Sequence, residues 1–465
     1  MSKSYEEFVN QIMNMRRFGN KTGVEVSTEL LDAFDHPEKG MKIIHVAGTN
    51  GKGSSCVFMA NVLMKMGLKV GLFTSPHLMD FNERIQVAQD NTFTRISHEE
   101  VIQIGQKILD KEIEASPTMF DICFMMAILK FKKEQCDYVI LETGLGGIYD
   151  STTAIACIPK VCLITSIGMD HTQYLGNSIE EVARNKAGIF VKGSIIILSD
   201  MEREALRVMK DRYMELGIED RDVLYVSDLD DKPYTYIKML PGYQKANAKA
   251  AIVSIKALVD GDKDTFIIKY MEYCKSKEEH CSNDCAHCHE ASDMCSISLD
   301  DWVDLCINMG ISGFSHPGRL EKLSKNVIMD GAHNEEAFTA LRSYIDSEYG
   351  SYKVHMIIGV LSDKEYQKGL DIIGPAIDSF MTADVADSRA KSGKELALEL
   401  TEEGYNAKYL GDEREVALYI EELMKKNNAN SSSKLYNNLY VITGSLYFVG
   451  NVKRILWQLQ QEQKP

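Results

Sequence analysis

Residues 43–58 restrict the fold of this chain more than any other segment. A short apolar run over residues 43–46 predicts a buried strand, and residues 54–63 predict a helix. Between these two elements lies a turn with glycines at positions 48, 51 and 53. A strand, a glycine-rich turn and a helix in this order are typical of open α/β sheets, so we expect a parallel sheet around this segment.

The composition of the turn favours a phosphate site. Glycines let backbone N–H groups approach phosphate oxygens, and the helix N-terminus adds the positive end of a dipole. Lys52 is the only lysine of the turn and would span the outer phosphates. The alternative is a plain glycine turn with an incidental lysine, which the flanking strand and helix argue against. We therefore predict ATP as a ligand, held by seven residues: Gly48, Thr49, Asn50, Gly51, Lys52, Gly53 and Ser54.

The spacing of this loop is unusual. The common phosphate loop has the pattern G-x-x-x-x-G-K-[ST], whereas only Thr49 and Asn50 separate the first two glycines here. Gly53 also stands between Lys52 and Ser54. In the common pattern a hydroxyl after the lysine binds Mg²⁺, so we assign Ser54 to the metal as well.

Length and charge limit the classes of function. The 465 residues suffice for two or three domains of roughly 150 residues each. The net charge of −16 argues against nucleic acid as the main partner, because phosphate backbones attract surfaces rich in lysine and arginine. The N-terminus is polar, and no apolar run approaches the roughly 18 residues of a membrane span. We therefore expect a cytoplasmic protein that does not act on membranes.

Strand-like and helix-like segments alternate along most of the chain, which predicts parallel sheets with helices on both faces. A cluster of glycine and proline at residues 310–318 marks a boundary. We expect an α/β protein in which an ATP-binding phosphate-loop domain, residues 1–312, precedes a smaller Rossmann-like α/β domain, residues 318–465. Strands are predicted over residues 42–46, 69–73, 137–142, 160–166, 194–198, 326–329, 353–359, 378–382 and 438–442.

Three predicted strands end in residues that suit a metal site. Ser75 and His171 each follow a predicted strand, and Glu142 ends one. The carboxyl ends of parallel strands meet at one edge of a sheet, where ligands bind. A carboxylate beside a phosphate loop is a usual ligand for the Mg²⁺ of bound ATP. The alternatives are a Ser-Pro turn, a strand-end glutamate in water and a structural histidine.

Lys186, Arg319 and Asp330 have competing interpretations. Lys186 lies late in a predicted helix, where a lysine commonly meets the negative end of the helix dipole, and the segment alone favours that structural role. Arg319 lies at the domain boundary, from where it could reach nucleotide phosphates. Asp330 ends an apolar strand, where it could accept from a ribose hydroxyl or orient a substrate amine.

Together, these segments resemble the folylpolyglutamate synthase/dihydrofolate synthase family of the Mur ligase superfamily. The resemblance runs from about Tyr5 to Arg454, with one insertion. It implies a Mur ligase-like fold and an enzyme in which ATP phosphorylates a carboxylate of folate or dihydropteroate. The amine of L-glutamate would then attack the acyl phosphate. The motifs are His45–Ser55, Thr74–Leu78, Glu142–Gly147, Thr165–Gly176 with Lys186–Gly188, Pro317–Glu321, Asp330–Asn334 and Gly444–Gly450.

The resemblance also implies roles for single residues. Lys52, His171 and Lys186 would be catalytic, and Lys186 matches a lysine that the family carbamylates to form an anionic metal ligand. This role replaces the structural interpretation of Lys186. Mg²⁺ would be bound by Ser54, Ser75, Glu142, His171 and carbamylated Lys186. ATP would also be contacted by Asn247, Arg319 and Asp330, and the substrate by His77, Phe120, Asp121 and His333.

The chain departs from the family pattern at three positions. The family usually has arginine and asparagine where this chain has Ile148 and Thr153, and glutamate where it has Asp121. These positions lie toward the substrate. We therefore expect the pterin or folate contacts to differ from the family more than the ATP contacts do.

Six of the eleven cysteines lie between Cys274 and Cys306, in or near an insertion at about residues 262–296 that the family pattern lacks. The spacing Cys281-x₃-Cys285-x₂-Cys288 is close to that of zinc ligands, so a structural or regulatory Zn²⁺ site is one hypothesis. The alternative is an exposed loop whose cysteines are incidental. The other five cysteines are expected to be reduced core residues.

Two alternative functions stay open on sequence grounds. A cell-wall amino-acid ligase of the same superfamily would carry a further N-terminal domain for its UDP group, and only 47 residues precede Gly48. The second alternative is a non-catalytic regulator that binds ATP and metal. Such a protein would not need a residue at each catalytic position, whereas this chain has a candidate at each of them. We expect a monomeric, folate-directed glutamate ligase, and the sequence does not decide between dihydropteroate and a folate as acceptor.

Overall fold

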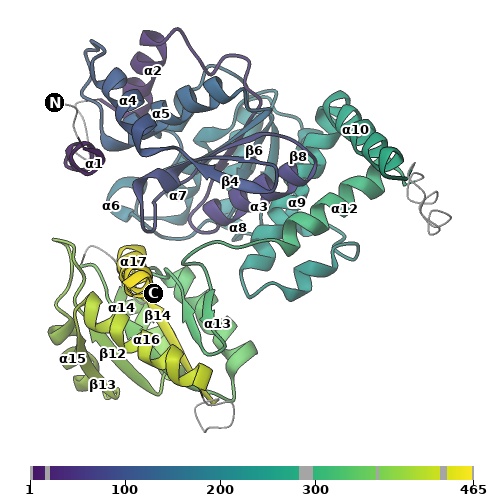
Figure 1. Ribbon diagram of the computed structural model, residues 1–465. Coiled ribbons are helices and arrows are strands. Elements are labelled where there is room, and N and C mark those ends of the chain that lie inside the picture. Colours follow the sequence, from purple (N-terminus) through teal and green to yellow (C-terminus); the bar gives the residue numbers. More distant parts are fainter. Residues whose placement is uncertain (1–3, 16–20, 282–296, 363–365, 430–436, 463–465) are drawn as a thin grey trace. The chain divides into compact units, whose positions relative to one another are not determined.

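The computed structural model describes residues 4–15, 21–281, 297–362, 366–429 and 437–462. The chain forms two compact units, each an α/β domain with its own sheet (Figure 1). Within the described residues, no helix has both the length and the apolar character needed to cross a membrane. Unit 1 comprises Met1–His77, Asn82–Leu240 and Gln244–Phe314, and unit 2 comprises Leu78–Phe81, Pro241–Tyr243 and Ser315–Pro465.

Unit 1 is built on an eight-stranded sheet with the order β4-β3-β2-β5-β1-β6-β7-β8. The six strands from β2 to β8 in this order pair in parallel. Since β1 lies between β5 and β6, the carboxyl ends of these central strands meet at one edge of the sheet. The strands are β1 (Ile43–Ala47), β2 (Val70–Phe73), β3 (Ile85–Gln89), β4 (Thr92–Arg95), β5 (Tyr138–Glu142), β6 (Val161–Ile164), β7 (Ile195–Leu198) and β8 (Val223–Tyr225).

Helices cover both faces of this sheet. On one face α3, α9 and α12 pack over an apolar cluster that includes Ile44, Val46 and Leu163 (Figure 1). On the other face α7 and α8 cover Cys162 and Ile164, because neighbouring residues of a strand point to opposite sides. The helices are α1 (Tyr5–Met13), α2 (Gly23–Ala33), α3 (Lys52–Lys65), α4 (His98–Leu109), α5 (Met119–Glu134), α6 (Thr172–Leu175), α7 (Ile179–Lys186), α8 (Arg203–Glu215), α9 (Gln244–Gly261), α10 (Lys263–Cys281) and α12 (Leu299–Ser312).

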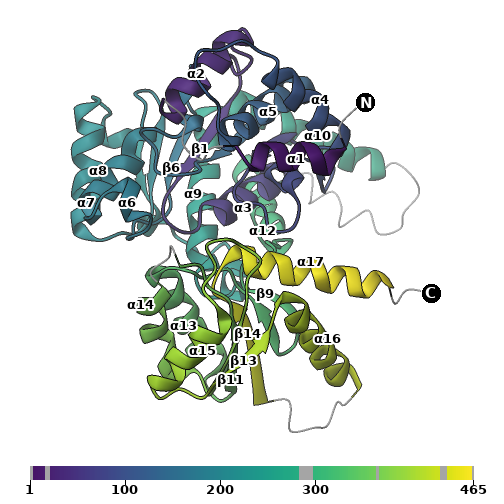
Figure 2. The ribbon, with the colours of Figure 1, turned by 90° about the vertical axis from the view of Figure 1, so that its left-hand side faces the viewer.

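Unit 2 contains a six-stranded sheet with the order β13-β12-β11-β14-β10-β9. Helices α13, α14 and α15 lie on one face, and α16 and α17 lie on the other (Figure 2). Met356 and Ile358 join the first apolar layer, whereas Ile357 between them joins the second. The strands are β9 (Glu321–Ser324), β10 (Val327–Met329), β11 (Lys353–Ile358), β12 (Ser379–Ala383), β13 (Ala407–Gly411) and β14 (Asn438–Thr443). The helices are α13 (Glu335–Tyr349), α14 (Tyr366–Ile373), α15 (Gly393–Glu402), α16 (Glu413–Ala429) and α17 (Leu446–Glu462).

The predicted α/β class is confirmed, and each predicted strand is present to within two residues at either end. Most strands pair in parallel, as predicted, but both sheets also contain antiparallel edge strands that were not predicted. β3 and β4 form an antiparallel hairpin at the edge of unit 1, and β9 pairs antiparallel with β10 in unit 2. Asp90 and Asn91 form the hairpin turn with φ of 49° and 60°, as a two-residue turn requires. β4 is mostly exposed and therefore has no apolar run to mark it.

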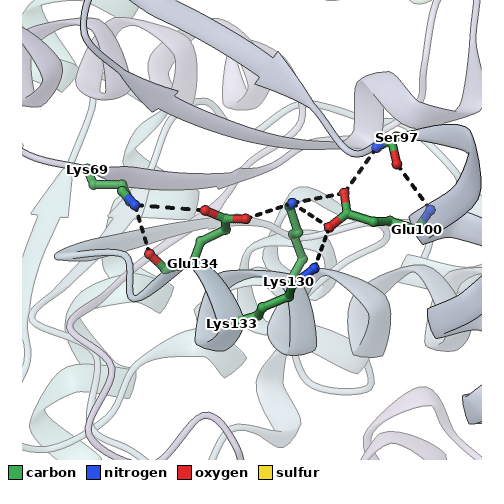
Figure 3. A network of polar contacts seen from close by, with 6 residues as sticks. All are labelled: Lys69, Ser97, Glu100, Lys130, Lys133 and Glu134. Carbon is green, nitrogen blue, oxygen red and sulfur yellow. Dashed lines mark hydrogen bonds and ion pairs between the residues drawn. The ribbon is translucent and has the colours of Figure 1, made fainter.

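A network of charged side chains joins α4 to α5 in unit 1 (Figure 3). Lys130 Nζ lies 2.8 Å from Glu100 Oε1 and 2.9 Å from Glu134 Oε1. Lys133 Nζ lies 2.9 Å from the same Glu100 oxygen, and the Ser97 N–H donates to the other. Burial on its own raises the pKa of Glu100, but the hydrogen bonds from Lys130, Lys133 and the Ser97 N–H, together with the charge of Lys130, lower the pKa to about 2.

Replacement Glu100→Gln should destabilise the protein by about 1–3 kcal/mol at pH 7, because charge-assisted hydrogen bonds are lost. The folded-state pKa lies below the ordinary value of 4.5. The contribution of Glu100 is therefore complete above about pH 4.5 and is lost as the pH falls toward 2. Urea unfolding between pH 7 and pH 3.5 should show a wild-type advantage that shrinks below pH 4.5. Glu99→Gln, at an exposed residue of the same helical turn, is the matched control. Equal losses in both variants, or a loss independent of pH, would contradict this prediction.

Candidate nucleotide and metal site

The predicted phosphate loop connects the end of β1 to the start of α3. Gly51 directly precedes α3 and has a left-handed backbone with φ of 86°. A Cβ atom there would lie 2.2 Å from Asn247 Oδ1, so both the conformation and the close approach require glycine. The first N–H groups of α3 are donors of the kind that bind phosphate oxygens at helix N-termini.

Hydrogen bonds hold the loop against the segment that follows β6. The Thr49 N–H donates to the Ser166 carbonyl at 2.7 Å, and the Thr49 hydroxyl donates to the Gly168 carbonyl at 2.9 Å. The Thr165 hydroxyl donates to the Asn50 carbonyl at 2.6 Å. Thr165, Ser166 and Gly168 thus support the loop, and all three lie in the segment Thr165–Gly176 that carries part of the family resemblance.

Two lysine side chains converge on the carbonyl oxygen of Gly48. Lys52 Nζ lies 3.0 Å from this oxygen and 3.2 Å from the Thr49 carbonyl oxygen. Lys186 Nζ lies 2.7 Å from the Gly48 oxygen, and the Lys186 residue is only 4% exposed. Two positive groups therefore stand beside the loop, where they can neutralise phosphate charge.

The predicted metal residues of β2 and β5 are also brought together. Glu142 is the last residue of β5 and lies beside Val46 in the register of β1, two residues before Gly48. Glu142 is 4% exposed, and its Oε2 accepts a 2.9 Å hydrogen bond from the Ser75 N–H. The carboxylate and the residue after β2 therefore share the sheet edge from which the phosphate loop starts.

His171 lies beyond β6, directly before α6. Its backbone has a φ of 50°, which is uncommon for a residue other than glycine. Its N–H donates to Asp170 Oδ1 at 2.8 Å, and its side chain is 40% exposed. A histidine held in a sparsely populated conformation at the edge of a sheet is a reason to expect a function for it.

The donor set suits Mg²⁺ bound together with a nucleotide. Ser54, Ser75 and Glu142 offer oxygen atoms, the ligand type that Mg²⁺ prefers. Among the described residues, no group of three or more histidine, cysteine, aspartate or glutamate side chains is arranged to hold a metal by itself.

The first turn of α9 contacts the phosphate loop. The Ser55 hydroxyl donates to the Asn247 carbonyl at 3.3 Å, and Asn247 Nδ2 donates to Gln244 Oε1 at 3.0 Å. Gln244 Nε2 donates in turn to Ser54 Oγ at 3.3 Å. No local pattern marks Gln244 in the sequence, and its complete burial beside Asn247 is evident only in the fold.

Phe120 and Asp121, both predicted on the substrate side, lie at the start of α5. Phe120 packs against Gly144 in the loop after β5, where an added Cβ would lie 2.5 Å from the ring. Asp121 is completely buried, and its carboxylate accepts from Ser151 Oγ at 2.5 Å and from the Thr118 N–H at 2.8 Å. Asp121, which the sequence predicts as a substrate contact, is thus a buried carboxylate that caps the first turn of α5.

The other substrate-side positions of unit 1 differ in exposure and partners. His77 Nδ1 accepts a 2.8 Å hydrogen bond from Arg84 Nε, which orients the ring. The Thr153 hydroxyl donates to the Gly147 carbonyl at 2.8 Å and so supports the loop after β5. Ile148 is 38% exposed and presents an apolar side chain where the resembled family has an arginine.

The predicted site residues of unit 2 surround the end of β10. Asp330 Oδ2 accepts a 2.5 Å hydrogen bond from the Tyr243 hydroxyl. Burial raises the pKa of the Asp330 carboxyl, whereas the Tyr243 hydrogen bond and the positive charge of Arg319 act in the opposite direction. His333 Nδ1 lies 2.9 Å from the Gly331 carbonyl oxygen. Within unit 2, Arg319 is thus close enough to Asp330 for its positive charge to lower the pKa of the carboxyl.

The predicted zinc ligands fall largely beyond what the structure describes. Cys281 is the last residue of α10, and Cys285 and Cys288 lie outside the described residues. Cys123 and Cys162 are buried free thiols, as expected for core residues. Burial raises the pKa of each of these two thiols to about 12, so both sulfurs stay protonated and unreactive near neutral pH.

Known sequences match both parts of the chain. Residues 46–252 match the Mur ligase middle domain family, and residues 318–455 match the family of the dihydrofolate synthetase C-terminal domain. A dihydrofolate synthase/folylpolyglutamate synthase from Bacillus subtilis is 31% identical over 483 aligned residues. That alignment covers 98% of this chain and 100% of the relative.

Solved structures share the fold along nearly the whole chain. Escherichia coli FolC in complex with DHPP and ADP has a TM-score of 0.76 at 23% identity and covers 99% of each chain. A bifunctional folylpolyglutamate synthase/dihydrofolate synthase with Mn, AMPPNP and L-glutamate bound has a TM-score of 0.73 at 24% identity, with 98% of each chain covered. At these identities the likeness establishes a common fold.

Proposed function

This chain belongs to the folylpolyglutamate synthase/dihydrofolate synthase family, and we propose that it is an ATP-dependent ligase that joins L-glutamate to a folate. ADP and phosphate are the other products. The observation that carries the proposal is the sheet edge of unit 1, where the phosphate loop, two lysines and Glu142 meet. A relative with both activities aligns over its full length. We therefore include dihydropteroate beside folate among the acceptors.

The proposed reaction solves a chemical problem in two steps. A carboxylate is a poor electrophile, so its oxygen first attacks the terminal phosphorus of ATP, and ADP leaves. The amine of L-glutamate then attacks the acyl carbon, phosphate leaves, and the amine loses a proton as the amide forms. Both steps bring anionic groups together, so the site has to supply positive charge and exclude water.

The residues of the phosphate loop fit the first of these tasks. The N–H groups at the start of α3 hold phosphate oxygens, and the Lys52 ammonium neutralises the charge of the outer phosphates. Ser54, Ser75, Glu142 and His171 hold or orient Mg²⁺. When bound, the metal screens the charge between ATP and the anionic acceptor. A solved relative has Mn and an ATP analogue bound, which supports a divalent metal for this chain.

Lys186 fits the proposed role of a carbamylated metal ligand. Its Nζ and that of Lys52 contact the same carbonyl oxygen, so two positive charges repel each other there. Attack of the neutral Lys186 amine on CO₂ forms an N–C bond, releases one proton and leaves an anionic carbamate. The repulsion between the lysines then becomes an attraction, and the site gains a further oxygen ligand for Mg²⁺.

The remaining assignments rest on the resemblance and on sequence position. Asn247, Arg319 and Asp330 are proposed nucleotide contacts, and His77, Phe120 and His333 are proposed substrate contacts. Asp121 is proposed to act through position only, because it holds the first turn of α5, which carries Phe120. The exposed side chain of Ile148 suggests that the acceptor meets an apolar contact where relatives supply an arginine.

A phosphate-release assay tests the proposed function. Purified protein is supplied with ATP, Mg²⁺ and L-glutamate, and with either dihydropteroate or tetrahydrofolate monoglutamate. Release that requires both L-glutamate and a pterin acceptor, with a product heavier by one glutamate residue, is the expected result. Release with one acceptor alone would restrict the enzyme to that step.

The same assay separates the alternative functions. Phosphate release with a UDP-linked cell-wall precursor but with neither pterin acceptor would favour the cell-wall ligase. No release with any acceptor, together with intact ATP binding, would favour the non-catalytic regulator. Either outcome would overturn the folate-directed ligase.

A further inference from the structure

Gln244 is a fully buried polar residue that the proposed reaction does not use directly. It is the first residue of α9 and is 0% exposed. A buried amide has to find hydrogen-bond partners, because an unsatisfied one costs about 1–3 kcal/mol. Its partners therefore indicate what the residue does.

Both ends of the Gln244 amide are engaged near the phosphate loop. Asn247 Nδ2 donates to Gln244 Oε1 at 3.0 Å, so the amide oxygen of Gln244 is hydrogen-bonded within α9. The nitrogen end then faces the loop, and Nε2 donates to Ser54 Oγ at 3.3 Å. Ser54 is 3% exposed and lies in the first turn of α3. A side chain 190 positions away in sequence therefore reaches this hydroxyl.

We propose that Gln244 is a positioning residue that orients the Ser54 hydroxyl toward the divalent metal of bound ATP. A serine oxygen can rotate among three staggered positions. A donor held on one lone pair restricts this rotation and so limits the directions in which the other lone pair, the one a metal would use, can point. The inference rests on the proposed function, because it assumes that MgATP binds at this loop.

The contacts of α9 extend this support to the neighbouring residues. The Ser55 hydroxyl donates to the Asn247 carbonyl, and Asn247 Oδ1 approaches Gly51 too closely for any Cβ atom there. The first turn of α9 thus contacts three residues of the loop and of the first turn of α3: Gly51, Ser54 and Ser55. Gln244 alone among these contacts bonds to the side chain assigned to the metal.

A purely structural role for Gln244 makes a different prediction. If Gln244 only packs α9 against α3, its loss should weaken nucleotide binding equally with and without metal. If it orients Ser54, metal-free nucleotide binding should be nearly unchanged, and the effect of Mg²⁺ should weaken. Losses of a supporting hydrogen bond at metal sites typically cost about 10-fold to 100-fold in metal affinity.

The test uses Gln244→Met, which keeps the length of the side chain and removes the donor. Fluorescence titration with mant-ATP, in EDTA and over a range of Mg²⁺ concentrations, measures nucleotide affinity without any folate. We expect the half-maximal Mg²⁺ concentration to rise by about 10-fold or more, with affinity in EDTA within about twofold of the wild type. Ser254→Ala is the matched control, because Ser254 is a buried polar residue of α9 whose hydroxyl donates to the Ala250 carbonyl of its own helix. The control should bind Mg²⁺ and nucleotide as the wild type does.

A double-mutant cycle decides whether Gln244 acts through Ser54. Ser54→Ala should raise the Mg²⁺ requirement, and adding Gln244→Met to that background should raise it no further. Additive effects, or equal losses of affinity in EDTA and in Mg²⁺, would overturn the inference. Gln244→Asn keeps an amide that is too short to reach both partners, and it replaces Gln244→Met if that variant does not fold. Failure of the wild type to release phosphate with any acceptor would contradict the proposed function and not the orientation of Ser54.

Discussion

Lys186→Ala should lower the ligation rate by roughly 1,000-fold or more and change nucleotide affinity by only a few-fold. The variant loses an anionic metal ligand if Lys186 is carbamylated, and metal stabilisation of transition-state charge is worth several kcal/mol. Nucleotide binding keeps Lys52 and the loop N–H groups, although the hydrogen bond from Lys186 to the Gly48 carbonyl is lost. Single-turnover phosphate release and mant-ATP titration measure the two quantities separately.

The control for this prediction lies on the same helix. Arg184 is an exposed residue of α7 whose closest acidic partner, Glu215, is 3.8 Å away, so Arg184→Ala should retain nearly full activity. Formate or acetate added to Lys186→Ala should restore part of the rate, because a small carboxylate can occupy the space of the carbamate. Wild-type turnover in Lys186→Ala would remove the residue from the mechanism. Rescue by methylamine and not by carboxylates would identify the ammonium, and not a carbamate, as the active form.

Glu142→Gln should also lower the ligation rate by roughly 1,000-fold, and it should raise the Mg²⁺ concentration needed for half-maximal activity. Glutamine keeps an acceptor oxygen for the Ser75 N–H, so the local fold should persist. The negative charge is lost, and with it most of the attraction of this oxygen for a dication. Initial rates over a range of Mg²⁺ concentrations, with thermal unfolding to monitor the fold, measure the effect.

The opposite end of the same strand provides the comparison for Glu142. Asp137 precedes β5, and its Oδ2 accepts a 2.8 Å hydrogen bond from the Lys69 N–H. Asp137→Asn also exchanges a carboxylate for an amide of the same size, far along the strand from the phosphate loop. Its Mg²⁺ dependence should equal that of the wild type. If Glu142→Gln and Asp137→Asn shared one Mg²⁺ dependence, Glu142 would not be a metal ligand.

Much of the α/β architecture was predictable because its signals are local. The strands near the site are continuous apolar runs, since parallel strands with helices on both faces are buried on both sides. The β3–β4 hairpin was missed because β4 is exposed and lacks such a run. The capping box of Thr118 and Asp121 is a local pattern, three residues apart. The buried contact of Asp121 with Ser151, 30 residues away, has no such local signal.

The phosphate loop, the strand-end Glu142 and membership of this enzyme family follow from the amino-acid order alone. In each case the informative residues are contiguous, and their spacing expresses a backbone conformation. Contacts between distant residues were decided only by tertiary packing. Lys186 reaches Gly48 across 138 positions, and Gln244 reaches Ser54 across 190. These contacts exist because α7 and α9 pack on opposite faces of one sheet and present single side chains at the edge where β1 ends. Such a geometry depends on how whole elements pack, and no short stretch of sequence encodes it.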